Sequence, residues 1–171
     1  MPNGIATRLL GICVLFAAAH LIRAGGVPEV MYPAAKYKML DNFEAHTLQK
    51  ADKAYSQKSY RLAAKLYDQF ILEYTKSKAT PYALARKGRC LQHDNKKFKA
   101  IKEYDEVLDY FPDDVYFATA ALYYKGECYW QAQEFKQAYL AWAEIAEDEE
   151  YRKQPWAGTA LKRFPSCSVP L

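Results

Sequence analysis

The chain has 171 residues, of which 51% are hydrophobic and 26% are charged, and this balance excludes both a wholly disordered chain and a protein with several membrane spans. The length suits one compact domain or a short array of stacked units. Seven glycines and 15 tyrosines favour helices that pack through aromatic side chains over a β-sheet.

Residues 1–24 are predicted to be an export signal. They carry an early arginine, then an apolar run from Leu9 to Ile22, and small residues at the end. Cleavage after Ala24 or after Ala19 fits the small-residue rule. The alternative is a retained N-terminal anchor, although the apolar run is shorter than the roughly 20 residues that span a bilayer. Residues 25–40 are then expected to be a linker.

The charge of the processed chain indicates no particular class of ligand. Loss of residues 1–24 removes two arginines and no acid, which leaves 22 basic against 20 acidic residues. Nucleic-acid binding needs a clustered excess of cations, so this balance gives no case for it. The basic run from Lys96 to Lys99 is expected to be a solvated turn, and the acidic run from Glu147 to Glu150 a solvated helix end.

An internal repeat dominates the rest of the sequence. With Gly88 aligned to Gly126, an offset of 38 residues pairs many identical or similar side chains. An earlier and weaker copy aligns at an offset of 37. A period of 20–50 residues is typical of units that each form one supersecondary element and bury their apolar faces by stacking. The pairs are Leu84 with Leu122, Cys90 with Cys128, Ala100 with Ala138, Tyr104 with Trp142, and, in the earlier copy, Ala63 with Ala100 and Tyr67 with Tyr104.

Within each unit the apolar spacing predicts two helices. Ala138, Trp142 and Ile145 recur at helical intervals, and the same stripe occurs upstream. The expected polar turns lie near residues 55–59, 93–97 and 131–134. Expected helix starts are Asp41 with Glu44 in capping-box spacing, Thr80 as an N-cap before Pro81, and Asp113 or Asp114 after Pro112.

The repeated glycine predicts a close contact between the two helices of a unit. A glycine inside a helix costs about 1 kcal/mol relative to alanine, so its recurrence requires an offsetting gain. Without side chains at Gly88 and Gly126, the facing helix can approach, and Tyr104 or Trp142 can cover the gap.

These residues resemble the tetratricopeptide repeat. The resemblance rests on Gly88 and Gly126, on alanines such as Ala138, on aromatics such as Trp142, and on Pro112 near the end of a repeat. It covers residues 41–150 as repeats at about 41–78, 79–115 and 116–150, and it looks most like the longer repeats of bacterial periplasmic and outer-membrane proteins, such as the cell-division coordinator and barrel-assembly lipoprotein D families. It implies an all-α, right-handed α-solenoid of about three helical hairpins plus a partial C-terminal helix.

After the repeats, residues 151–171 are expected to form a partial capping helix, starting near Pro155, and a tail. The alternative is that the chain is a truncated piece of a longer array, which would leave the apolar side of Trp156, Leu161 and Phe164 uncovered.

The resemblance also implies a partner-binding surface on the concave face, formed by the first helix of each repeat. Tyr, Trp and Arg on that face are typical of binding hot spots, and a peptide or helix of a protein partner could lie there. Several of the tyrosines are instead expected to pack between helices. The positions concerned are Leu48, Gln49, Asp52 and Tyr55 in the first repeat, Tyr82, Arg86, Arg89, Gln92 and His93 in the second, and Tyr123, Tyr124, Glu127, Trp130 and Gln131 in the third.

The family's chaperone-tail carboxylate clamp is not expected, because Arg89 stands where that clamp needs an asparagine. Cys90 and Cys128 are expected to be buried free thiols, since equivalent helices lie about 8–10 Å apart and bridged Cα atoms lie within about 7 Å.

No catalytic motif, metal site or cofactor site is expected. His46 and His93 lack a metal-ligand spacing, and the sequence holds no glycine-rich phosphate loop and no nucleophile elbow. The prediction is a non-catalytic scaffold or adaptor of the bacterial periplasm or cell envelope, which binds a protein or peptide and no nucleic acid. The alternatives are a structural protein associated with the cell wall or peptidoglycan, and a fragment of a larger repeat protein.

Overall fold

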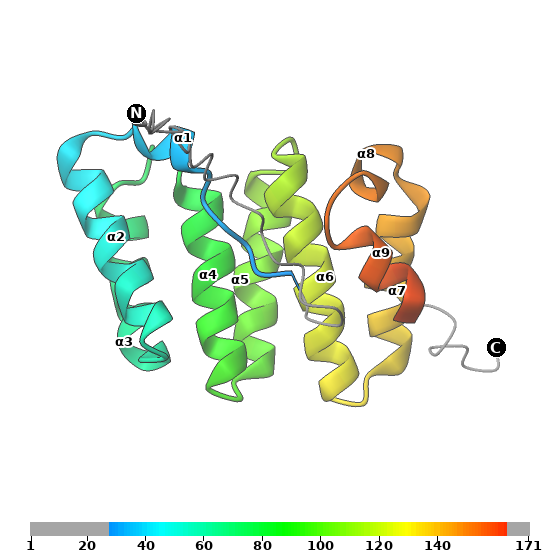
Figure 1. The fold of residues 1–171 in the computed structure, drawn as a ribbon. Helices are drawn as coiled ribbons and strands as arrows, with labels where there is room; N and C mark the ends of the chain where they lie inside the picture. The colour runs from blue at the N-terminus through cyan, green and yellow to red at the C-terminus, as the bar shows by residue number, and fades with distance from the viewer. Residues whose placement is uncertain (1–27, 164–171) are drawn as a thin grey trace, which may run out of the picture.

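The computed structural model describes residues 28–163, and all regular secondary structure in that range is helical (Figure 1). The all-α prediction is therefore confirmed for this part of the chain. The predicted export signal or anchor and the tail from residue 164 lie outside it. In chain order the helices are α1 (Ala34–Tyr37), α2 (Asn42–Ser56), α3 (Tyr60–Glu73), α4 (Thr80–His93), α5 (Lys97–Tyr110), α6 (Val115–Gln131), α7 (Phe135–Glu147), α8 (Glu149–Arg152) and α9 (Ala157–Arg163).

The long helices form three hairpins that pack side by side. Helix α2 packs on α3, α4 on α5, and α6 on α7, while α3–α4 and α5–α6 contacts join one hairpin to the next (Figure 1). Helices α4 and α6 also contact each other directly. Helix α4 contacts α3, α5 and α6, and α6 contacts α4, α5 and α7, so most residues of both helices are buried. The side chains of α4 and α6 that do not pack between the hairpins lie on a surface that both helices share.

Each hairpin turn ends its first helix in the same way. Lys58, Asn95 and Gln133 have left-handed backbone angles, with φ of 58°, 59° and 65°. In each turn the next residue's N–H reaches back five positions, as from Ser59 to the carbonyl of Ala54, and the left-handed residue's N–H reaches back three. This is the Schellman motif. Its recurrence at the repeat spacing confirms the predicted turns.

The two repeated glycines lie directly beneath aromatic rings. A Cβ built on Gly88 would lie 2.5 Å from Tyr104 Cε1, and one on Gly126 would lie 2.2 Å from Trp142 Nε1. The indole of Trp142 also donates from Nε1 to the carbonyl of Tyr123 at 3.2 Å. The predicted close approach of the paired helices is confirmed, and the ring itself fills the space that the absent side chain leaves.

The observed helix starts agree only in part with those predicted from the sequence. Asp41 and Glu44 form the expected capping box at α2. The prediction of Thr80 as an N-cap is wrong, because α4 begins at Thr80 itself, whose Oγ1 donates to the carbonyl of Ser77 at 2.8 Å. Asp114 directly precedes α6, but its side chain accepts no capping hydrogen bond. The acidic run contains a cap that the sequence analysis missed, since Asp148 accepts from two backbone N–H groups of α8.

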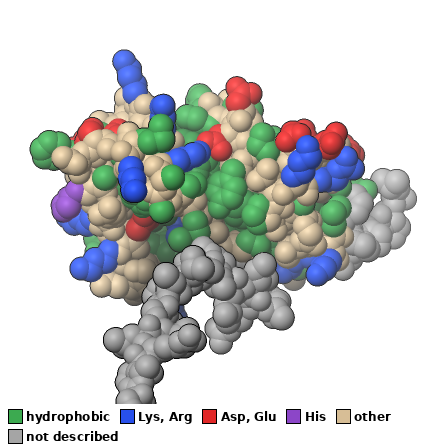
Figure 2. Space-filling view, turned by 45° about the horizontal axis from the view of Figure 1, so that its top comes forward, with side chains coloured by type: hydrophobic (Ala, Val, Ile, Leu, Met, Phe, Trp, Pro, Cys, Tyr) green, Lys and Arg blue, Asp and Glu red, His purple; other side chains and the backbone are tan. Residues whose placement is uncertain are grey.

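The C-terminal helices close the third hairpin. Helix α9 packs on α7, and Trp156, just before α9, is fully buried against Tyr116 and Tyr124. On the face that Figure 2 shows, acidic and basic side chains mix at the end formed by α8 and α9, where Lys153 pairs with Glu149 and Glu150.

Candidate functional site

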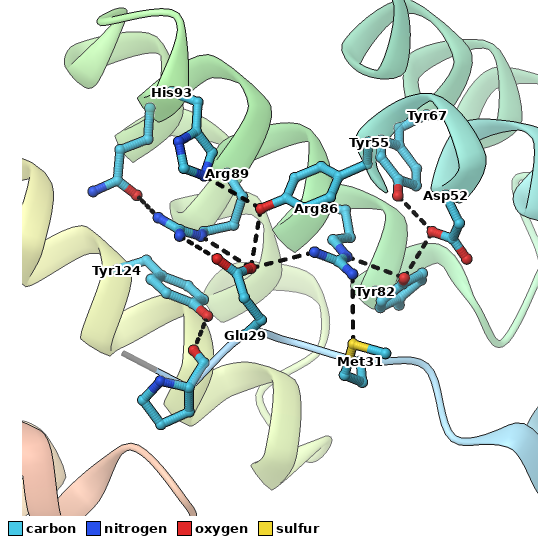
Figure 3. A network of polar contacts seen from close by, with 12 residues as sticks. Glu29, Met31, Asp52, Tyr55, Tyr67, Tyr82, Arg86, Arg89, His93 and Tyr124 are labelled. Carbon is cyan, nitrogen blue, oxygen red and sulfur yellow. Dashed lines mark hydrogen bonds and ion pairs between the residues drawn. The ribbon is translucent and has the colours of Figure 1, made fainter. Parts of the chain in front are cut away.

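Two buried arginines on α4 form the centre of the candidate site. The guanidinium of Arg86 lies 4.1 Å from the centre of the Tyr55 ring of α2, and that of Arg89 lies 4.3 Å from the Tyr124 ring of α6 (Figure 3). Their three-residue spacing places both on one face of α4. We call this surface, made of Tyr55, Arg86, Arg89 and Tyr124, the arginine face.

Neighbouring side chains fix both guanidinium groups. Arg86 Nε donates to the Tyr82 hydroxyl at 3.1 Å, and Arg89 Nη1 donates to Gln92 Oε1 at 2.6 Å. The two side chains are only 7% and 9% exposed. A buried cation is costly unless an anion pairs with it, so the arginine face requires a negative group.

That negative group is Glu29, from an extended segment that precedes α1. Arg89 Nη2 donates to Glu29 Oε1 at 2.5 Å, and Arg86 Nη1 donates to Oε2 at 3.2 Å (Figure 3). The Tyr55 hydroxyl adds a hydrogen bond to Oε2 at 3.0 Å. One carboxylate thus bridges two arginines that lie 57 and 60 residues later in the chain.

The residues around Glu29 hold the rest of the segment. The carbonyl of Pro28 accepts from the Tyr124 hydroxyl and from Trp156 Nε1, the latter at 2.9 Å. Val30 is fully buried. We call residues 28–32 the N-terminal segment; in Figures 1 and 3 it crosses the ribbons of α4 and α6.

The last two residues of the N-terminal segment make further contacts. The backbone N–H of Met31 donates to the Tyr116 hydroxyl at 3.4 Å, and the sulfur of Met31 accepts from Arg86 Nη2 at 3.6 Å. The buried ring of Tyr32 packs against Tyr82 and Phe117, with ring centres 5.2 and 6.5 Å apart.

A second carboxylate, Asp52 of α2, is surrounded by tyrosine hydroxyls. Tyr67 and Tyr82 donate to Asp52 Oδ1 at 2.5 and 2.7 Å, and Tyr37 of α1 donates to Oδ2. Since Tyr82 also accepts from Arg86, the hydroxyl of Tyr82 links Asp52 to the arginine face (Figure 3). Burial raises the pKa of Tyr67 and of Tyr82, so both remain protonated donors.

The arginines control ionisation at the site. Burial by itself would raise the pKa of Glu29, but the hydrogen bond from Arg89 and the charges of Arg89 and Arg86 outweigh it and lower that pKa below its ordinary value. Burial, and then repulsion from Arg89, lowers the pKa of His93. The face is therefore built for a carboxylate and against a further cation.

The structure joins part of the predicted partner-binding set to this network. His93 Nε2 lies 3.4 Å from the Tyr55 hydroxyl, and its ring stacks on Tyr60 with centres 4.2 Å apart. The predicted residues that lie in the network around the arginine face are Asp52, Tyr55, Tyr82, Arg86, Arg89, Gln92, His93 and Tyr124.

Other predicted residues serve packing or lie outside this network. Tyr123 is fully buried, as expected for some of the tyrosines. Glu127 is buried and pairs with Arg163 Nε of α9 at 3.1 Å, so an intramolecular cation occupies it. Trp130 packs on Phe135 and Trp142. Leu48 is fully buried, while Gln49 and Gln131 are exposed.

The sequence does not predict that the N-terminal segment belongs to the site, because residues 25–40 carry no helical period and are expected to be a linker. Glu29 and Met31 alternate with the buried Val30 and Tyr32. This two-residue alternation is typical of an extended chain with one buried face, and it was the available signal.

Within residues 28–163, no group of three or more His, Cys, Asp or Glu side chains could hold a metal ion, and no helix is long and apolar enough to cross a membrane. Cys90 and Cys128 are buried free thiols, as predicted.

Comparisons with protein-family models, curated proteins and solved structures give no match to this chain. Function is therefore inferred from the geometry of the site.

Proposed function

We propose that this protein is a non-catalytic interaction module whose arginine face binds an extended segment of a partner protein. The observation that carries the proposal is the bridge from Glu29 to Arg86 and Arg89, in which a single carboxylate in an extended chain satisfies two buried cations. Arginine that pairs with a carboxylate beside aromatic rings is typical of binding hot spots.

Further observations support a type of fold and a cellular location for this interaction module. The hairpins, their recurrent turns and the glycine-to-ring contacts support a tetratricopeptide-like α-solenoid, whose inner surface would contain the arginine face. The N-terminal 24 residues support export, and hence a scaffold or adaptor in the bacterial periplasm or cell envelope.

A pull-down from bacterial envelope extract tests the proposal. The bait is the full chain, compared with the Arg86→Ala/Arg89→Ala variant and with Lys136→Ala, an exposed change on α7 that serves as control. We expect the wild type and the control to retain a protein that the double variant loses, while circular dichroism shows all three folded. Retention of the same proteins by the folded double variant would reject the proposal.

The same three proteins are sedimented with purified peptidoglycan. Binding to the glycan by all three, without any arginine-dependent protein partner, would favour the alternative of a structural protein associated with the cell wall.

A further inference from the structure

We infer that the N-terminal segment, residues 28–32, is a built-in ligand of the arginine face, and that a partner binds by displacing it with an extended segment of the same chemistry. This inference rests on the proposed function and specifies the partner. The required pattern is an acidic residue, an aliphatic residue directly after it, and an aromatic residue three positions after the acid, as in Glu29, Val30 and Tyr32.

The N-terminal segment contacts the fold in the way that a bound peptide would. Its carboxylate pairs with two cations, Val30 is fully buried, and Tyr32 lies against the rings of Tyr82 and Phe117. The main-chain carbonyl of Pro28 accepts from side chains of α6 and of the turn before α9. The main-chain N–H of Met31 donates to a side chain of α6. This combination of main-chain bonds with alternating side-chain contacts is typical of the recognition of an extended peptide.

The N-terminal segment is also suited to release. Within residues 28–163 its backbone makes no hydrogen bond to another backbone group, and it belongs to no helix or strand. The Glu29 side chain is 38% exposed and Met31 is 50% exposed, so water can reach the ion pair. Segments with few backbone hydrogen bonds and partial exposure open locally at low free energy.

Contacts within the helices are expected to hold the arginine face in place when the N-terminal segment leaves. Arg86 and Arg89 are held by Tyr82 and Gln92, and each guanidinium also lies over an aromatic ring. An empty arginine face would hold two buried cations without their bridging carboxylate, so it would favour an incoming acid over a neutral or basic segment.

Fluorescence anisotropy of a labelled peptide tests the inference. The peptide carries residues 25–33 (GGVPEVMYP) with a fluorophore at its N-terminus, and a matched peptide has Gln in place of Glu. Each is titrated into the full wild-type chain, into Glu29→Gln, and into Glu29→Gln/Tyr32→Ser. The Glu29→Gln/Tyr32→Ser double variant is included because Val30 and Tyr32 also hold the N-terminal segment on the helices.

We expect the Glu peptide to bind the double variant at least about tenfold more tightly than the wild type, whose own segment competes. We expect the Gln peptide to bind the double variant at least about tenfold more weakly than the Glu peptide does. Saturating Glu peptide should also accelerate amide hydrogen exchange at residues 29–32 of the wild type, because those residues are displaced.

Equal affinity of the Glu peptide for the wild type and the double variant would overturn the inference. So would an absence of binding to variants that melt cooperatively, at protein concentrations up to about 1 mM. If the peptide fails to bind while the pull-down still yields a partner that depends on Arg86 and Arg89, the built-in ligand is rejected and the proposed function stands.

Discussion

Gly126 and Trp142 are in such close contact that no side chain fits between them: a Cβ at position 126 would lie 2.2 Å from the indole nitrogen. The same relationship joins Gly88 to Tyr104 one repeat earlier. In both hairpins, a missing side chain on the first helix allows an aromatic ring of the second helix to lie against its backbone.

This contact predicts that Gly126→Ala destabilises the protein. Alanine has the better helix propensity, but the displaced indole would lose its packing and its hydrogen bond to the carbonyl of Tyr123. We expect a net loss of about 1–3 kcal/mol of unfolding free energy, measured by urea denaturation. Gly158→Ala in α9 is the control, because a Cβ there meets nothing within 4 Å. An equal effect of the two substitutions would contradict the prediction.

The Schellman turns predict two stabilising substitutions. Lys58 and Gln133 adopt left-handed angles that are unfavourable for residues with a Cβ, whereas glycine adopts them freely. We expect Lys58→Gly and Gln133→Gly each to raise the unfolding free energy by about 0.5–1 kcal/mol. Ala132→Gly, one residue earlier in a right-handed conformation, should lower it. Thermal melts of the three variants check the sign, and a lower midpoint for Gln133→Gly would contradict the assigned turn.

The cluster around Asp52 predicts a large effect of its removal. Asp52→Ala would leave the hydroxyl donors of Tyr37, Tyr67 and Tyr82 without their common acceptor. We expect a loss of about 2–4 kcal/mol of unfolding free energy, since buried unsatisfied donors are costly. Asp68→Ala should lower the unfolding free energy by less than about 1 kcal/mol, because this half-exposed residue forms a salt bridge with Lys87 near the surface. Similar effects of the two substitutions in urea denaturation would show that the tyrosine cluster contributes no special stability.

The lowered pKa of Glu29 predicts how the contribution of this residue to stability depends on pH. A carboxyl group with a lowered folded-state pKa stabilises the fold fully above its ordinary pKa of 4.5 and loses this contribution as the pH falls below that value. Because Glu29 is more than a third exposed, solvent screening limits the contribution to about 1 kcal/mol.

The measurement is the difference in unfolding free energy between the wild type and Glu29→Gln. We expect it to shrink between about pH 7 and about pH 3. Glu103 and Glu127 have pKa values that burial raises, so each acts in the opposite direction, but both chains contain them and their effects cancel in the difference. A difference that stays constant over this range would contradict the ion pair with Arg86 and Arg89.

The two buried thiols are predicted to be unreactive in the folded protein. Burial raises the pKa of Cys90 and of Cys128 to about 12, so the reactive thiolate is scarce at neutral pH. We expect iodoacetamide at about pH 8 to modify neither residue until denaturant is added, as read by mass spectrometry of the corresponding peptides. Rapid labelling of Cys90 in the native protein would mean that α4 opens readily.

Much of the helical framework could be predicted from the sequence, because the information is local and repeated. The stripe of Ala138, Trp142 and Ile145 defines a helix face from its period alone, and the repeated glycines predict where paired helices approach. The capping box of Asp41 with Glu44 is likewise contained in four consecutive residues. These features depend on neighbours within about one helical hairpin.

Only the tertiary structure decided what meets the arginine face. Arg86 and Arg89 were recognisable as candidates, but the carboxylate that bridges them lies about 60 residues earlier, in a segment without helical period. Tyr123 and Tyr124 are adjacent in sequence, and yet the first packs on Trp142 while the second stacks on Arg89 and binds Pro28. Contacts between distant segments depend on how the hairpins pack, and the periodicity of one helix does not contain that information.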